Sequence, residues 1–165
     1  LLLLLLLLLM LLLRIIFLAT SPYIYASEQT NDETEILEMI QDIEKGWESG
    51  NGMPFYQHYL GQVGARYIES GSQNKGLEDL VKNHVEPEKE VLKRLTIDIL
   101  DIETNVEGDF AWAVTTVNVS GEVRKTGAVF DKKGFQTYLF RRTDEGWKVI
   151  HSHSSTRDNK PHKHR

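Results

Sequence analysis

Two residues of this sequence, Glu69 and His84, have the chemistry needed for proton transfer. His84 follows Leu80 by four residues and Val81 by three, so it belongs to the apolar face of a predicted helix and points inward. An imidazole in a pocket acts as a base or a proton donor, and a carboxyl group in a dry cavity has a raised pKa that suits the same chemistry. We therefore expect Glu69 and His84 as candidate catalytic residues. The alternatives are a core histidine bonded to the backbone or to a carboxylate, and a buried salt bridge between Glu69 and an arginine.

Aromatic, hydroxyl and imidazole side chains form the candidate wall of a ligand pocket. Tyr67 shares a strand face with Glu69, and Trp112 shares a face with Thr116, because side chains alternate along a strand. For Trp112 the alternative is an ordinary core position. The predicted pocket residues are Tyr67, Trp112, Thr116, Tyr138, His151 and His153.

The pair His151 and His153 allows a second interpretation, because residues i and i+2 of a strand face the same side. By the same alternation, both share a face with Trp147. The pair could join a third histidine and a carboxylate around zinc, iron or manganese. The candidate ligands are then His84, His151, His153 and either Glu69 or Glu88. The alternative is that this strand face packs against a dimer partner; we favour it, and predict no metal and no cofactor.

The elements that must position these residues change from helical to strand periodicity along the chain. Apolar residues recur at helical spacing over 33–49 and 76–95, and Pro87 interrupts the second stretch. Alternating patterns predict strands over 65–70, 96–104, 110–119, 135–142 and 147–155. Helices first and a strand meander afterwards indicate an α+β fold. We expect the N-terminal helices to pack on one face of a strongly curved antiparallel sheet, which encloses a pocket as a cone.

Composition excludes several classes of function. The chain has 165 residues, of which 41% are hydrophobic, enough for one domain with a core. Its 19 basic and 24 acidic residues give a net charge of −5, which disfavours nucleic-acid binding. Without cysteine, the chain has no disulfide scaffold, no thiol nucleophile and no cysteine-ligated zinc. The motifs of nucleotide-binding folds and of serine hydrolases are also absent from the sequence.

Residues 1–19 are apolar except for Arg14, a pattern typical of a targeting or membrane segment. We predict a signal peptide over 1–26, because Arg14 would cost a few kcal/mol at the middle of a bilayer. The alternative is an uncleaved anchor over 1–19, which would be the only part of the protein in the membrane. The expected domain covers 27–157, and a disordered polar tail follows over 158–165. We therefore expect an exported protein, periplasmic or secreted.

The final predicted hairpin, residues 140–155, reads FRRTDEGWKVIHSHSS. This stretch resembles the last hairpin of the NTF2-like superfamily, especially its SnoaL-like and DUF4440 branches and the association domain of calcium/calmodulin-dependent kinase II. The earlier stretch 67–71, followed by His84, is similar to a bacterial subset of these proteins. The resemblance covers about residues 33–157. It implies a cone-shaped α+β fold, a pocket between the helices and the concave sheet, and a homodimer.

Departures from the family patterns limit what the resemblance implies. The kinase association domain holds arginines in its pocket, and by this alignment those positions fall at Tyr138 and Ser154, so an anion pocket is not implied. The motifs of ketosteroid isomerases and scytalone dehydratases are not matched residue by residue, so no activity follows. We predict binding of a small, partly apolar molecule in the cone pocket. The alternatives are a cofactor-independent lyase or isomerase with Glu69 or His84 as acid/base, a metal-assisted variant, and a dimerisation module.

Overall fold

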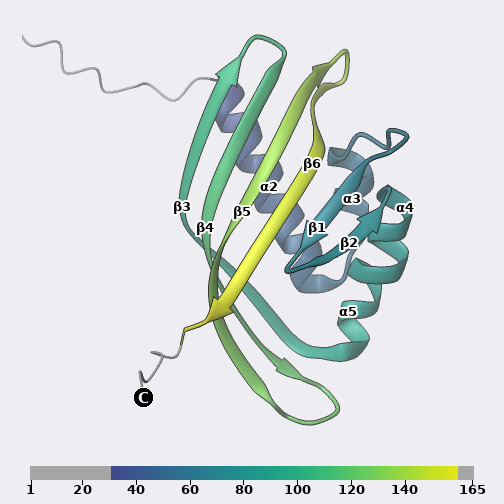
Figure 1. The fold of residues 1–165 in the computed structure, drawn as a ribbon, viewed down its shortest axis with the longest axis vertical. Helices are drawn as coiled ribbons and strands as arrows, with labels where there is room; N and C mark the ends of the chain where they lie inside the picture. Colours follow the sequence, from purple (N-terminus) through teal and green to yellow (C-terminus); the bar gives the residue numbers. More distant parts are fainter. Residues whose placement is uncertain (1–30, 160–165) are drawn as a thin grey trace, which may run out of the picture.

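The computed structural model describes residues 31–159, so the leader predicted over 1–26 and residues 160–165 of the tail lie outside the described residues (Figure 1). The helical elements are α2 (Asn31–Ser49), α3 (Met53–His58), α4 (Leu77–Leu80), the π-helix η1 (Val81–Val85) and α5 (Glu86–Val91). The strands are β1 (Arg66–Glu69), β2 (Ser72–Lys75), β3 (Leu92–Glu107), β4 (Phe110–Val123), β5 (Val129–Thr143) and β6 (Gly146–Asp158). Within 31–159, no helix combines the length and the hydropathy needed to cross a membrane.

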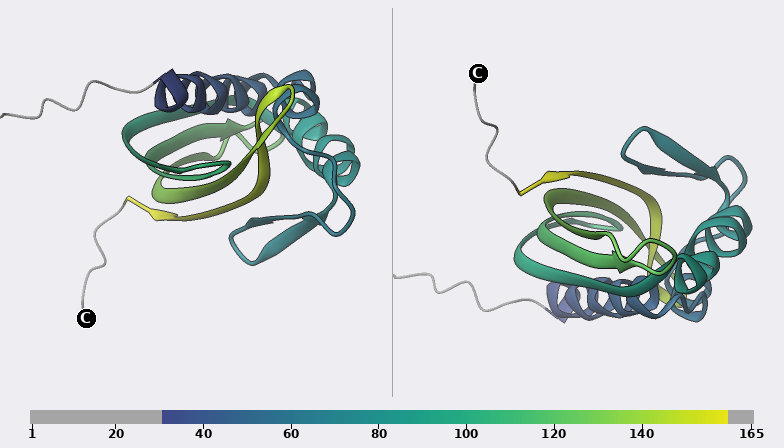
Figure 2. Two further views of the ribbon diagram at one scale, coloured as in Figure 1. Left: turned by 90° about the horizontal axis from the view of Figure 1, so that it is seen from above. Right: turned by 90° about the horizontal axis from the view of Figure 1, so that it is seen from below.

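The strands form one six-stranded sheet in the order β2-β1-β6-β5-β4-β3, which curls around one side of the helices (Figure 2). The long strands β3 to β6 are antiparallel neighbours, as the alternating pattern predicts. β1 instead lies parallel to β6, with Tyr67 beside Ser152 and Glu69 beside Ser154. The sheet is therefore mixed rather than purely antiparallel, and it stays open at β2 and β3. The predicted α+β class, with helices packed on a curved sheet, is confirmed.

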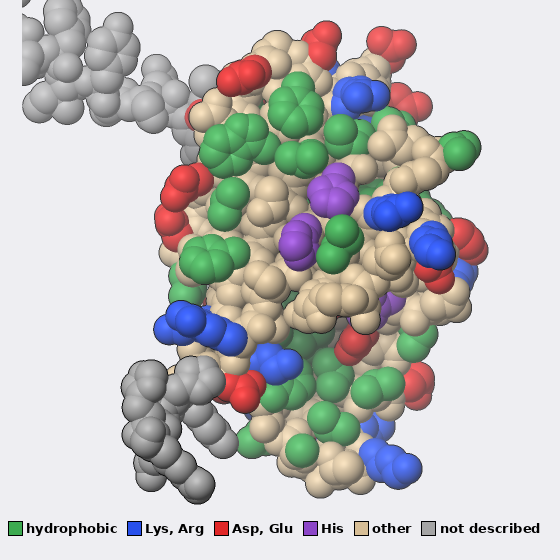
Figure 3. All heavy atoms as spheres, in the orientation of Figure 1, with side chains coloured by type: hydrophobic (Ala, Val, Ile, Leu, Met, Phe, Trp, Pro, Cys, Tyr) green, Lys and Arg blue, Asp and Glu red, His purple; other side chains and the backbone are tan. Residues whose placement is uncertain are grey.

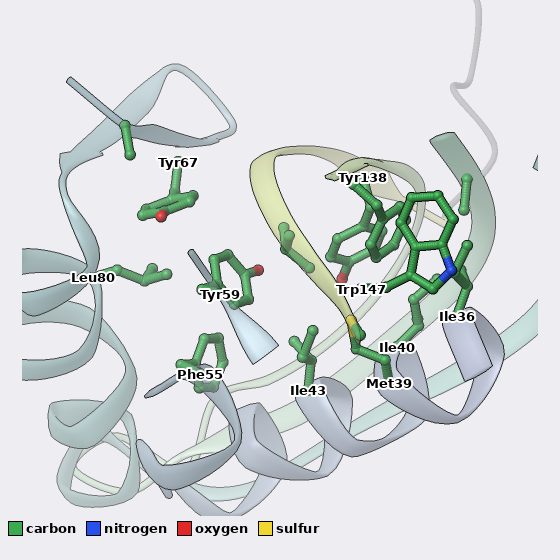
Figure 4. Close-up of a cluster of buried hydrophobic side chains, with 14 of the residues drawn as sticks. Ile36, Met39, Ile40, Ile43, Phe55, Tyr59, Tyr67, Leu80, Tyr138 and Trp147 are labelled. Carbon is green, nitrogen blue, oxygen red and sulfur yellow. The ribbon is translucent and has the colours of Figure 1, made fainter. Parts of the chain in front are cut away.

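The core forms where the apolar stripe of α2 meets the concave face of the sheet (Figure 4). Ile36, Ile40 and Ile43 recur at helical spacing and are fully buried, and each contributes about 1.5–3 kcal/mol by leaving water. β4 presents Ala111 and Ala113 to the same core, and their small side chains allow a close approach of the helix. α2 therefore covers one part of the concave face completely and leaves the rest for other elements to enclose.

The N-terminal end of α2 is attached to the last hairpin by a polar cluster. The Asp32 carboxylate lies 2.6 Å from Nη2 of Arg142 and accepts a hydrogen bond of 3.2 Å from Nε1 of Trp147. The Arg142 guanidinium also stacks over the Trp147 ring at 4.3 Å. The residues of the hairpin motif therefore join the sheet to α2.

A single π-helical turn, η1, precedes Pro87. Proline has no N–H, and its ring crowds the carbonyl group four residues earlier, here that of Asn83. The wider turn relieves this clash, and the Glu86 N–H bonds to the Val81 carbonyl five residues back. The interruption predicted at Pro87 is thus a change of helix type, and the widened turn carries His84.

Candidate functional site

A cavity of about 300 Å³ lies between the helices and the part of the concave sheet that α2 leaves uncovered. Two rows of polar side chains cross three strands at one end of it. The first row, in register across β1, β6 and β5, is Tyr67, Ser152 and Tyr138. The second row consists of Glu69 and Ser154, two residues later on β1 and β6, and of Gln136, two residues earlier on the antiparallel β5. Side chains two residues apart share a face, so both rows point to the concave side.

The other end of the cavity is mainly apolar. Its wall comes from the beginning of β3 and from the facing parts of β4 and β5, and consists of Leu92, Leu95, Ile97, Val119 and Phe130. Lys132 is the one cation of this end among the described lining residues. The cavity therefore offers a polar end and an apolar end to one molecule, an arrangement common in small-molecule sites.

His84 reaches the polar end from the π-helical turn, and protein groups contact both of its ring nitrogens. Nε2 lies 3.0 Å from Oε2 of Glu69, and Nδ1 lies 2.9 Å from Oδ1 of Asn74. The Asn74 amide is oriented by a 3.5 Å hydrogen bond from its Nδ2 to the Asp79 carbonyl. The Trp47 and His84 rings form a T-shaped pair, with 4.9 Å between ring centroids. The imidazole is therefore held in one orientation.

These contacts favour the charged form of His84. Both partners present oxygen acceptors, and only a protonated imidazolium donates from both nitrogens. The hydrogen bond to Glu69 is the main reason that the His84 pKa is raised above 6.5, and burial opposes it. At neutral pH His84 is thus better suited to donate a proton or to stabilise negative charge than to act as a base.

Two tyrosines close the polar end in their neutral forms. The Tyr59 hydroxyl donates to Oγ of Ser152 at 3.3 Å. The buried hydroxyl of Tyr67 has no hydrogen-bond partner among the described residues. Burial raises the pKa of Tyr67 to about 12 and raises that of Tyr59 further, so both phenols keep their protons at neutral pH.

Glu44 of α2 is a buried acid next to the cavity that we did not predict. Its side chain is only 3% exposed, and Oε1 accepts a hydrogen bond of 2.7 Å from the Tyr138 hydroxyl. Burial raises the Glu44 pKa to about 7, although the Tyr138 hydroxyl and the Gln136 side chain pull it partly back. A sequence signal existed: Glu44 follows Ile40 by four residues and therefore lies on the apolar stripe of the helix.

The structure brings together four of the eight predicted site residues. Tyr67, Glu69, His84 and Tyr138 line the cavity. Tyr138 does so with its hydroxyl already committed to Glu44. The salt bridge considered for Glu69 has formed with a histidine rather than with an arginine.

The placement of Trp112, Thr116, His151 and His153 in the pocket is wrong, because all four lie on the outer face of the sheet. In β4 the smaller residues face the core, so Trp112 and Thr116 point away from it. Figure 3 shows histidines among hydrophobic side chains on the face formed by the strands. His151 contacts the Arg66 carbonyl there, at 2.8 Å from Nδ1.

A bulge in β6 explains the error for the two histidines. Leu139 pairs with His151, whereas the next residue, Phe140, pairs with Val149, so Ile150 has no partner in the register. The extra residue reverses the alternation after Val149, and the histidines leave the face that Trp147 occupies. They are therefore separated from His84 by the sheet. Within 31–159, no group of three or more histidine or carboxylate side chains is arranged to hold a metal ion.

Comparison with known proteins gives a family and a fold. The model of the SnoaL-like domain family matches residues 34–158. An NTF2-like superfamily protein from Salmonella enterica serovar Typhimurium superimposes with a TM-score of 0.70 at 15% identity, covering 80% of this chain and 96% of that one. A proposed ketosteroid isomerase from Shewanella frigidimarina gives a TM-score of 0.61 at 22% identity, covering 72% and 92%. A proposed dehydratase of the NTF2-like family from Streptomyces avermitilis gives 0.66 at 17% identity, covering 75% and 95%. No curated protein matches this chain significantly.

Proposed function

This chain belongs to the SnoaL-like domain family, and we propose that it binds one small, partly apolar molecule in the cavity between its helices and its curved sheet. The observation that supports the proposal is the cavity itself, with its polar rows at one end and its apolar wall at the other. A site of this size and mixed lining suits a molecule that buries an apolar body and keeps a few directed hydrogen bonds.

The test is binding of the fluorescent probe N-phenylnaphthylamine to the full chain and to two variants of β6. Ser154→Phe fills the cavity, whereas Ser155→Phe places the same ring on the outer face, because neighbouring residues of a strand point in opposite directions. We expect the first variant to weaken binding at least about tenfold and the second to leave it unchanged. Equal binding by both variants would show that the probe binds elsewhere and would refute the proposal.

A second candidate function is a cofactor-independent lyase or isomerase. It is supported by the ion pair between His84 and Glu69, whose side chains line the cavity at 26% and 47% exposure. In this mechanism a carboxylate oxygen of Glu69 takes a proton from the carbon beside a ligand carbonyl, and the electron pair of the broken C–H bond forms an enolate. Tyr67, whose hydroxyl is unpaired, would donate a hydrogen bond to the enolate oxygen, and the His84 imidazolium would stabilise that oxygen by its charge, because both of its N–H groups are already bonded.

Deuterium exchange tests this mechanism without knowledge of the natural substrate. Acetophenone in D₂O exchanges its methyl protons only through the enolate, and NMR follows the loss of the methyl signal. We expect exchange above the buffer rate with the wild-type protein, and a loss of at least about a hundredfold in Glu69→Gln. Exchange at the same rate in Glu69→Gln would remove Glu69 from the mechanism. Exchange at the buffer rate in all samples would refute the enolate mechanism and leave ligand binding as the remaining proposed function.

We further propose that the protein is exported, on the strength of the apolar run over 1–19. N-terminal sequencing of the protein isolated from its native cells distinguishes the two forms of this proposal. A mature chain that begins at Ser27 supports a cleaved signal peptide. A chain that keeps the run and sediments with membranes supports the anchor.

A homodimer through the outer face of the sheet is also proposed. The support is the exposed aromatic surface of that face, where Phe135 is 59% and Phe110 39% exposed. Sedimentation equilibrium should give the mass of two chains for the wild type and of one chain for Phe135→Lys. A monomeric wild type would contradict the proposal.

A further inference from the structure

Glu88 of α5 is a partly exposed carboxylate that lines the polar end of the cavity, and the one ion pair it forms among residues 31–159 is a long contact with His84. Its side chain lines the cavity at 27% exposure, and within residues 31–159 no donor forms a hydrogen bond with it. Nε2 of His84 lies 4.0 Å from Oε1 of Glu88, and that nitrogen already bonds to Glu69. Burial raises the Glu88 pKa, as expected for a carboxyl group withdrawn from water without a donor in return.

A carboxylate offers acceptors only, so the missing partner is a donor. Trp47 lies beside this group: it packs on His84, and it lines the main cavity together with Glu88. The face of an indole ring attracts cations, and a ring together with a carboxylate is the chemistry that recognises an organic ammonium group.

The balance of charge at this end points the same way. The His84 imidazolium is neutralised by Glu69, which leaves the charge of Glu88 uncompensated. Lys132 is four residues from Gln136 along β5, so it lies about 13 Å from the second polar row. A carboxylate or phosphate head group would therefore meet repulsion at the polar end of the main cavity, whereas the smaller pocket beside it is lined by Lys89, Lys93, Arg94 and Arg124.

We infer that the cavity selects an organic ammonium ion with an apolar body, and that Glu88 and Trp47 hold the ammonium group. The apolar body then lies along Leu95, Val119 and Phe130 at the other end. The inference rests on the proposed function, because it specifies which molecule the cavity binds. Tyr67 adds a second unpaired polar group to the same wall.

The experiment compares octylamine, octanol and octanoate, which share one alkyl chain and differ in the charge of the head group. Isothermal titration calorimetry near neutral pH measures each Kd for the full chain. We expect octylamine to bind about tenfold more tightly than octanol, as one hydrogen-bonded charge pair provides, and octanoate to bind most weakly. In Glu88→Gln the preference for octylamine over octanol should disappear.

Glu90→Gln is the matched control, because it removes the same charge from an exposed position of the same helix. It should keep the preference for octylamine; a loss there equal to that in Glu88→Gln would refute the inference and indicate attraction by net charge alone. Equal binding of octanol and octylamine to the wild type would also refute it, as would a preference that survives in Glu88→Gln. If no octyl compound binds, the inference fails, and N-phenylnaphthylamine then shows whether the proposed function fails with it.

Discussion

Replacing Glu44 by glutamine should make the protein more stable at alkaline pH, although it removes a buried hydrogen-bonded acid. The Glu44 pKa is raised from 4.5 to about 7 in the folded state, chiefly by burial. For the binding of one proton, this pKa difference corresponds to about 3 kcal/mol of folding free energy. Glutamine resembles the protonated acid, and its amide oxygen keeps the hydrogen bond from the Tyr138 hydroxyl.

The sign follows from which state binds the proton more tightly. Because the folded pKa of Glu44 is the higher one, its contribution to stability is fully present below pH 4.5 and is lost as the pH rises through about 7. The wild-type protein therefore loses up to about 3 kcal/mol over this range from Glu44 alone. Glu44→Gln has no group that titrates at this position, so its free energy of unfolding should match that of the wild type at acid pH. The difference in favour of the variant should grow as the pH rises through about 7.

Urea unfolding from about pH 5 to about pH 8.5, followed by tryptophan fluorescence, measures both stability curves. Trp147 is 1% exposed and will report the loss of the core. Glu38→Gln, at an exposed position of α2, is the matched control and should leave the pH dependence unchanged. A difference between Glu44→Gln and the wild type that is the same at every pH would refute the argument, because it would show that Glu44 does not titrate in this range.

Other predictions concern the ion pairs and the buried hydroxyl. Glu69→Gln should lower the His84 pKa, because the hydrogen bond that His84 donates to Glu69 is the main cause of its elevation, and NMR titration of the imidazole ring measures the change. An unchanged pKa would contradict the assigned pairing. Asp32→Ala should destabilise the fold by about 1–3 kcal/mol in urea unfolding, since Nε1 of Trp147 loses its acceptor; a loss near zero would show that water replaces the carboxylate. Thr115→Val should lower the free energy of unfolding by about 1–3 kcal/mol, because it removes the buried hydroxyl that donates to Oε1 of Gln136 at 2.8 Å. An unchanged midpoint of urea unfolding would contradict this prediction.

The elements with strong local patterns could be predicted, and so could half of the site. The isoleucine stripe of α2 identifies the helix and its buried face, because helical spacing alone decides which side chains share a side. The same reasoning places His84 inward, and the structure has it lining the cavity. Glu44 was within reach of this argument too, since an acid four residues after Ile40 must be buried with the stripe.

The sequence by itself determined the α+β class, the order of the long helix and the four long strands, and the inward position of His84, because these follow from spacing within one segment. The short strand β2 (Ser72–Lys75) was not predicted, and residues 92–95 belong to β3 rather than to the expected helix. Tertiary structure alone decided the partners. β1 pairs in parallel with β6, and this brings Glu69 to His84 from a different segment. The unpaired Ile150 reverses the faces of His151 and His153, which no alternation rule detects, because a bulge depends on the register of the neighbouring strand. The site is thus set by pairings between distant segments, whose free energy is gained only when the whole sheet has formed.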